Sequence, residues 1–116
     1  LILRIKSEHA YHIVKHLPVM AASANAMVHD AIEAFIDQDL DAAMEIIERD
    51  DEVDTLFNQV KDDVIHLLQS SPDQADQGID LLMVAKYLER IGDHAVNVCE
   101  WTQFSKTGAL KNVRIM

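Results

Sequence analysis

The stretch LERIGDHAVNVCEW, residues 88–101, has the residue spacing of a helix that is apolar on one face. Leu88 and Ala95 fall in one row of a seven-residue pattern, and Ile91 and Val98 fall in the row beside it. Residues seven apart return to nearly the same side of a helix, so the two rows predict a helix that packs lengthwise against neighbouring helices.

Two features of this stretch do not fit a helix that only buries apolar surface. Gly92 lies in its middle, where glycine costs roughly 1 kcal/mol relative to alanine. Glu89 and Asp93 lie one turn apart on one face, where like charges repel. The stretch therefore calls for a role besides packing.

The same periodicity extends over the rest of the chain. Ile46, Val53, Val60 and Leu67 are spaced by seven, and a further apolar stripe covers residues 13–35. The patterns predict helices over about residues 7–36, 40–70 and 72–106. We expect an all-α fold in which residues 1–116 form a single domain, an elongated antiparallel up-down-up three-helix bundle.

Local signals mark where the helices begin and end. Asp39 can cap the second helix, and Ser71 can cap the third with Pro72 in its first turn and Gln74 completing a capping box. Gly108 can end the third helix. Two interior residues carry further expectations: Pro18 is expected to kink or open the first helix, and Trp101 is expected to pack in the core.

The charge and cysteine content exclude several classes of protein. Acidic residues outnumber basic ones by 20 to 10, which gives a net charge of −10. Such a surface repels a phosphate backbone, so nucleic acid is not an expected partner, whereas cations are attracted. Cys99 is the one cysteine of the sequence, so no internal disulfide forms, which fits a cytoplasmic location. The sequence shows no secretory signal and no apolar run long enough to span a bilayer.

Acidic residues on two helices form the candidate functional site. Asp50 occupies an apolar row of the second helix, and Asp54 follows one turn later. Glu89 and Asp93 repeat this arrangement in the third helix, so antiparallel packing can bring four carboxylates together. A buried carboxylate needs a partner, and oxygen ligands favour magnesium, manganese or iron, less often zinc. Gly92 then provides clearance for a metal or for the neighbouring helix.

Two segments resemble the PhoU family, whose members regulate phosphate uptake in bacteria. Residues 85–100, AKYLERIGDHAVNVCE, are similar to the family's signature helix, and residues 49–54, RDDEVD, look like its other motif on the preceding helix. The resemblance extends from about residue 20 to residue 108. It implies one three-helix repeat, most like the C-terminal one because of His94 and Trp101.

The resemblance also implies a site, cofactors and partners. Family members carry paired acidic motifs that bind iron or zinc, in clusters of several ions, and these motifs map onto Asp50, Asp54, Glu89 and Asp93; manganese and magnesium remain further candidates. The implied function is a cytoplasmic regulatory adaptor between a phosphate ABC transporter ATPase and a sensor histidine kinase, which reaches the membrane only through these partners. One repeat instead of the usual two implies a homodimer or a second bundle.

Other functions remain open. The resemblance also allows the PhoU-like regulatory domain of a sodium-phosphate cotransporter, and the residues alone allow an oligomerisation bundle without metal. A metal-dependent phosphohydrolase is a third class, but no nucleophile stands beside a base and no Gly-rich phosphate loop is present, so we expect no enzyme. His9, His12 and His16 have a metal-compatible helical spacing, as does Asp63 with His66, although an exposed polar face is the simpler interpretation.

Overall fold

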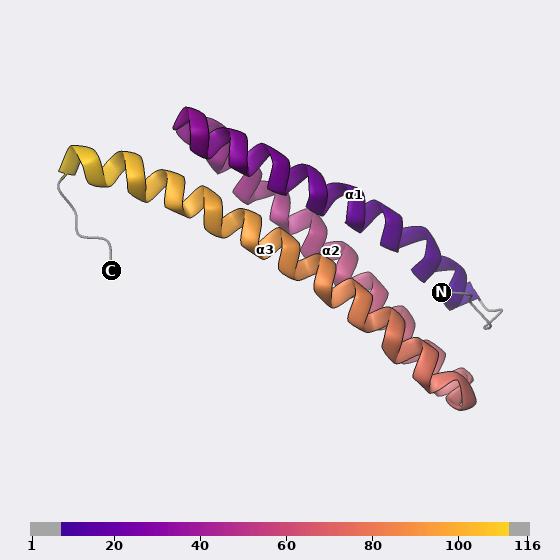
Figure 1. Cartoon of the computed structure of the whole chain (residues 1–116). Helices are drawn as coiled ribbons and strands as arrows, with labels where there is room; N and C mark the ends of the chain where they lie inside the picture. The colour runs from indigo at the N-terminus through magenta and orange to yellow at the C-terminus, as the bar shows by residue number, and fades with distance from the viewer. Residues whose placement is uncertain (1–7, 112–116) are drawn as a thin grey trace.

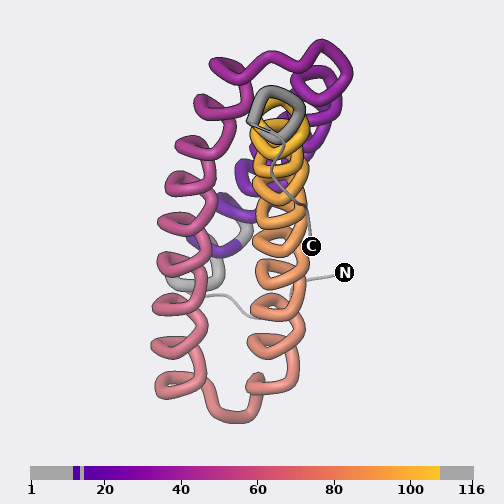
Figure 2. Tube along the Cα trace, turned by 90° about the vertical axis from the view of Figure 1, so that its left-hand side faces the viewer, coloured from indigo at the N-terminus to yellow at the C-terminus, as the bar shows by residue number. Residues whose placement is uncertain are grey.

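The computed structural model describes residues 8–111, with side chains described from residue 12 to residue 107 except at Val14. Three long helices make up this part of the chain: α1 (Glu8–Asp37), α2 (Leu40–Ser70) and α3 (Ala75–Lys111), with a short 3₁₀ turn η1 (Pro72–Gln74) before α3. The helices lie side by side (Figure 1), and their turns alternate between the two ends of the bundle (Figure 2). The fold is therefore the expected up-down-up bundle, and it measures 58 Å along its longest axis.

The predicted seven-residue rows are buried to different degrees: the α2 row and Ala95 of α3 lie in the core, whereas Leu88, Ile91 and Val98 of α3 are half-buried. Val53, Val60 and Leu67 are fully buried and Ile46 is 3% exposed, so the α2 row is confirmed along its whole length. The polar end of the α3 row is buried as well: Thr102 has no exposed surface, and its hydroxyl donates to the Val98 carbonyl at 3.1 Å. Among the described side chains, sixteen apolar ones from all three helices make up the core: Ile13, Met20, Ala24, Met27, Ala31, Ala34, Ala43, Ile46, Val53, Val60, Val64, Leu67, Leu81, Ala85, Ala95 and Cys99.

The turn between α1 and α2 confirms the predicted cap. The Asp39 side chain accepts a hydrogen bond from the Ala42 N–H at 3.1 Å, which satisfies one of the free donors at the start of α2. Gln38 has a φ of 54°, a left-handed conformation that ends α1 abruptly. Lys106 of α3 donates to the Gln38 carbonyl at 3.0 Å, so the third helix is tied to this turn.

The predicted capping box at the start of the third helix is wrong. Ser71 makes no side-chain cap, and the Gln74 side-chain oxygen is buried without a hydrogen-bond partner. The Gln74 N–H, which the Ser71 hydroxyl was expected to cap, donates instead to the Ser71 carbonyl at 2.9 Å. A 3₁₀ turn therefore supplies that bond, and Pro72 stands at its start as expected.

Of the two outcomes expected at Pro18, the opening of α1 is wrong: α1 is one continuous helix, because buried residues on both sides hold it to the bundle. Two expectations about α3 are also wrong. Gly108 does not end α3: its backbone remains helical, and the helix runs on to Lys111. Trp101 is 51% exposed rather than in the core. Between residues 8 and 111, no helix is both long and apolar enough to cross a membrane.

Candidate metal centre

Three of the four predicted acidic residues meet between α2 and α3. Asp50 and Asp54 come from successive turns of α2, and Asp93 comes from the facing side of α3. One oxygen from each can be chosen so that the three atoms lie within 4.8 Å of one another. We call Asp50, Asp54 and Asp93 the acid centre; the antiparallel packing of α2 and α3 forms it.

Gly92 makes room for the innermost carboxylate of the acid centre. A Cβ atom on Gly92 would lie 2.9 Å from Asp50 Oδ1, closer than side chains tolerate, whereas its next neighbour, Val53 Cγ1, would be at an ordinary 3.6 Å. Gly92 is buried, so the glycine lets the Asp50 carboxylate lie directly against α3. The space that Gly92 was expected to leave for a metal or for the neighbouring helix is thus filled by the Asp50 carboxylate.

Asp50 is placed without the partner that a buried carboxylate needs. Its Oδ1 atom is buried and has no hydrogen bond in the described part of the chain. Burial, followed by the charges of Asp54, Asp93 and Glu89, raises the pKa of Asp50 to about 6. Burial and then the charges of Glu89 and Asp93 also raise the pKa of Asp54. The ionised acids therefore destabilise one another, and a bound cation would remove that repulsion.

Glu89, the fourth predicted residue, lies beside the acid centre with its own partner. Lys86 Nζ donates to Glu89 Oε1 at 2.6 Å, one turn away along α3. The same ammonium group lies 5.2 Å from the centre of the Phe57 ring on α2. Lys86 was missed at the sequence level, although its three-residue spacing from Glu89 was a signal that could have identified it.

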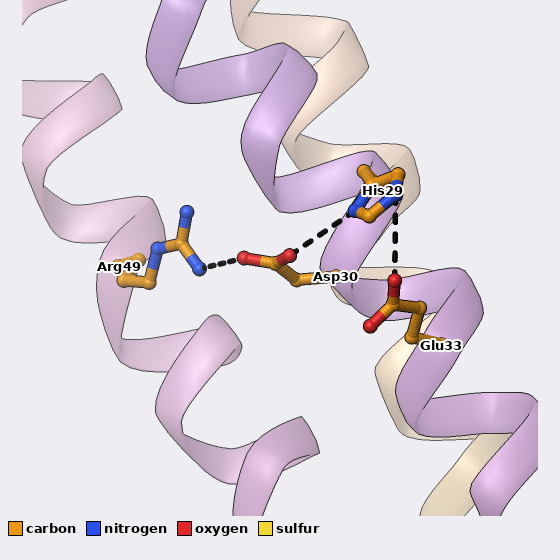
Figure 3. Close-up of polar contacts among 4 residues, drawn as sticks. All are labelled: His29, Asp30, Glu33 and Arg49. Carbon is orange, nitrogen blue, oxygen red and sulfur yellow. Dashed lines mark hydrogen bonds and ion pairs between the residues drawn. The ribbon is translucent and has the colours of Figure 1, made fainter.

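A second group of charges lies nearby, between α1 and α2, and differs from the acid centre because it contains a guanidinium (Figure 3). Arg49 Nη1 donates to Asp30 Oδ2 at 2.7 Å. His29 lies 3.4 Å from Asp30 and 3.4 Å from Glu33. The hydrogen bonds from Arg49 and then from His29 lower the pKa of Asp30. No pattern in the sequence joins Asp30 to Arg49, because the turn between the helices sets their register.

The acid centre fits a hard or borderline cation on its own residues. Three carboxylates supply only oxygen donors, the ligand type that suits magnesium, manganese and iron. In the described part of the chain, the unpartnered Asp50 Oδ1 provides a free lone pair. Of the metals that the acidic motifs were expected to hold, this donor set suits magnesium, manganese and iron better than zinc.

The histidines of α1 whose side chains the structure describes do not join the acid centre. His12 and His16 lie on the α1 segment that faces Asp63 of α2, with His12 Nδ1 at 3.9 Å from Asp63 Oδ1. The His9 side chain lies outside the described residues. His66 is exposed on α2, one turn from Asp63. The two histidine patterns of the sequence thus meet at one end of the bundle.

Comparison with known proteins places the whole bundle in one family. The PhoU domain matches residues 17–102. The phosphate-specific transport system accessory protein PhoU homolog of Clostridium acetobutylicum is 36% identical over 107 residues, which cover 92% of this chain and 49% of the relative. PhoU homolog 1 of Thermotoga maritima is 31% identical over 104 residues, covering 90% and 44%. The chain thus spans about half the length of these relatives, and it belongs to the PhoU family.

Proposed function

We propose that this chain is a regulatory adaptor of bacterial phosphate uptake and phosphate-starvation signalling. Its membership of the PhoU family carries the proposal, since the relatives are named accessory proteins of a phosphate-specific transport system. In this proposal the chain acts in the cytoplasm and binds the ATPase of a phosphate ABC transporter and a sensor histidine kinase. It performs no catalysis.

The acid centre is proposed to hold the metal that accompanies this role. Asp50, Asp54 and Asp93 would supply the ligand oxygens, and Glu89 could add a fourth if it left Lys86. A bound cation would neutralise the clustered charge and join α2 to α3. Iron and zinc are the first candidates, followed by manganese and magnesium, as one ion or several.

An apolar hollow between α1 and α3 supports a role in binding other proteins. Ile32 and Phe35 of α1 and Val98 and Trp101 of α3 line a volume of about 430 Å³ that is open to solvent. Ile32, Phe35 and Trp101 are each between 42% and 51% exposed. Large apolar side chains that line a hollow of this kind are typical of the centres of protein interfaces.

Binding to the purified transporter ATPase and to the kinase's cytoplasmic part, both from the same organism, tests the proposal. We expect the metal-loaded chain to bind at least one of them, and we expect chelation or the Asp50→Asn/Asp54→Asn/Asp93→Asn variant to weaken that binding. Asp62→Asn/Asp73→Asn/Asp80→Asn is the matched control, because it removes three charges from exposed sites. Binding to neither protein would overturn the adaptor role, and binding that ignores metal would overturn the metal's part in it.

The same protein samples can also show whether the chain is an adaptor or only an oligomerisation bundle. Sedimentation equilibrium with and without chelator measures self-association. A chain that self-associates equally in both conditions, and binds neither transporter nor kinase, would be an oligomerisation bundle. A chain that binds the cytoplasmic face of a sodium-phosphate cotransporter instead would be a regulatory domain of that transporter.

A further inference from the structure

We infer that His12 and His16 of α1 and Asp63 of α2 form a second metal site, which takes a borderline divalent cation of the zinc class. The two histidines lie one turn apart on α1, and the carboxylate faces them from the neighbouring helix. This site shares no residue with the acid centre, and its existence does not depend on the proposed function.

The positions of the three side chains support the inference. His12 Nδ1 lies 3.9 Å from Asp63 Oδ1, and the centres of the His12 and His16 rings are 6.4 Å apart. The Asp63 side chain is only 14% exposed, whereas that of His12 is 42% exposed. A largely buried carboxylate is thus flanked by a partly exposed imidazole.

His16 provides a separate observation that points to a ligand. Its Nδ1 atom is buried and has no hydrogen-bond partner, although buried polar atoms in folded proteins nearly always have one. Neutral imidazole nitrogen is also the commonest metal ligand in proteins. A cation between the helices would give this nitrogen the partner that the described residues do not supply.

A small movement would complete the site. At 3.9 Å the His12–Asp63 pair is too long for a hydrogen bond. Two donors bonded to one tetrahedral zinc ion at about 2.0–2.2 Å are separated by roughly 3.3–3.6 Å, so the His12–Asp63 pair must close by a few tenths of an ångström. Among the described residues, three donors already lie within 4.8 Å only in the acid centre; here the His12 and His16 rings must turn towards Asp63.

The donor chemistry distinguishes this site from the acid centre. Two imidazoles and one carboxylate are a ligand set that zinc uses with a water molecule in its fourth position. Imidazole suits zinc, cobalt and nickel, whereas an all-carboxylate group suits magnesium and manganese. The chain's net charge of −10 raises the local concentration of any cation, so the two sites would select by ligand type.

Cobalt(II) binding to the full chain tests the inference, because tetrahedral Co²⁺ with nitrogen ligands absorbs visible light. The acid centre is first removed by Asp50→Asn/Asp54→Asn/Asp93→Asn. In that background we expect one Co²⁺ per chain, displaced by Zn²⁺. Adding His16→Phe, which keeps a ring of similar shape, or Asp63→Asn should weaken binding by at least about tenfold. His29→Phe, which removes an exposed imidazole from the same helix, is the matched control and should leave binding unchanged.

Two results would overturn the inference: no Co²⁺ uptake once the acid centre is removed, or equal uptake with and without His16. If His16→Phe unfolds the bundle by circular dichroism, NMR of ¹⁵N-labelled imidazoles in the acid-centre variant decides instead. Zn²⁺ should then shift the ring nitrogens of His12 and His16 while those of His29 and His94 stay in place. Shifts confined to His29 and His94 would overturn the inference as well.

Discussion

Asp30 and Asp50 are carboxylates at helix interfaces of the same bundle, yet their environments act in opposite directions. Asp30, between α1 and α2, receives a hydrogen bond from Arg49, which lowers its pKa. Asp50, between α2 and α3, has a buried oxygen without a partner and a pKa raised to about 6. Arg49 is the neighbour of Asp50 in the sequence. It nevertheless donates its hydrogen bond to Asp30.

The difference shows how helix geometry decides which charge is neutralised within the fold. Successive residues of a helix point about 100° apart, so Arg49 faces α1 while Asp50 faces α3. Asp50 is left with Asp54 and Asp93, which add negative charge. Asp30 thus has a basic partner within the fold, whereas the buried oxygen of Asp50 has no hydrogen-bond partner among the described residues.

The largest effect is expected from removing the acid centre. Asp50→Asn/Asp93→Asn deletes two of three charged ligands, and we expect metal affinity to fall by at least about 100-fold, the upper end for residues that merely support a ligand. Elemental analysis after purification and calorimetric titration with Fe²⁺, Mn²⁺ and Zn²⁺ measure it. Asp30→Asn, an acid that already has Arg49, is the control and should retain the metal. An equal loss of metal affinity in both variants would contradict the proposed difference between the α1–α2 and α2–α3 interfaces.

Asp50→Asn alone should stabilise the metal-free protein. The carboxyl is protonated in the folded and unfolded states below about pH 4, but only in the folded state between there and its raised pKa of about 6. Its contribution to the free energy of unfolding is therefore present at low pH and lost as the pH rises through about 6. At pH 7.5 we expect the variant to gain about 1–2 kcal/mol in urea denaturation with chelator, after allowance for solvent screening. A variant less stable than wild type at pH 7.5 would contradict this account.

Gly92→Ala should separate stability from site geometry. Alanine favours the helix by roughly 1 kcal/mol, but its Cβ would lie 2.9 Å from Asp50 Oδ1 and push the carboxylate aside. We expect the metal-free protein to gain up to about 1 kcal/mol, since only the end of a side chain must move, while metal affinity falls about tenfold. Gly78→Ala, whose Cβ would meet only leucine and valine side chains at 3.4 Å or more, is the control for helix propensity. Unchanged metal affinity in Gly92→Ala would contradict the role of clearance.

The smallest effect is expected at the paired interface. Arg49→Gln removes the main cause of the lowered pKa of Asp30, and partly exposed ion pairs contribute only about 0.2–1 kcal/mol. A carboxyl with a lowered pKa stabilises the fold above its ordinary pKa of about 4 and loses that contribution as the pH falls. We therefore expect the variant to lose about 0.5 kcal/mol at pH 7 and to differ less from wild type at pH 3. Arg49→Lys should restore part of the loss.

Much of the bundle could be predicted from the sequence because burial follows helical periodicity. The seven-residue rows identified the α2 core, and Asp50 was singled out because it interrupts such a row. Short-range hydrogen bonding was harder: the Gln74 N–H had two possible acceptors within Ser71, the hydroxyl and the carbonyl, and the carbonyl accepts the bond. Trp101 was misplaced because a helical position near the edge of an apolar stripe can be buried or exposed.

The site was predictable only as far as residue type and spacing extend. The approach of α2 to α3 brings Asp50, Asp54 and Asp93 together, and the acidic spacing indicated that. The ion pair from Lys86 to Glu89 lies within α3, and its three-residue spacing was a signal that the sequence offered. The ion pair from Arg49 to Asp30 depends on the register between α1 and α2, which spacing along one helix does not encode.

The two ends of the bundle are held by different forces, which has a consequence for how the helices open. At the α2–α3 end, η1 and its backbone hydrogen bonds join the helices. At the other end, α3 is tied to the α1–α2 turn by Lys106, which lies among Asp37, Asp39 and Asp41 as it donates to the Gln38 carbonyl. Salt screens such charge-assisted contacts but hardly affects a covalent turn.

Hydrogen–deuterium exchange should reveal this asymmetry as a local opening reaction. At high ionic strength we expect amides in the last turns of α3 to exchange faster, while those in its first turns keep their rates. Lys106→Gln should give the fast pattern already at low salt. The bundle would then behave as a hairpin of α2 and α3 that stays closed at η1. At the other end, the contact between Lys106 and the α1–α2 turn would open as the salt concentration rises.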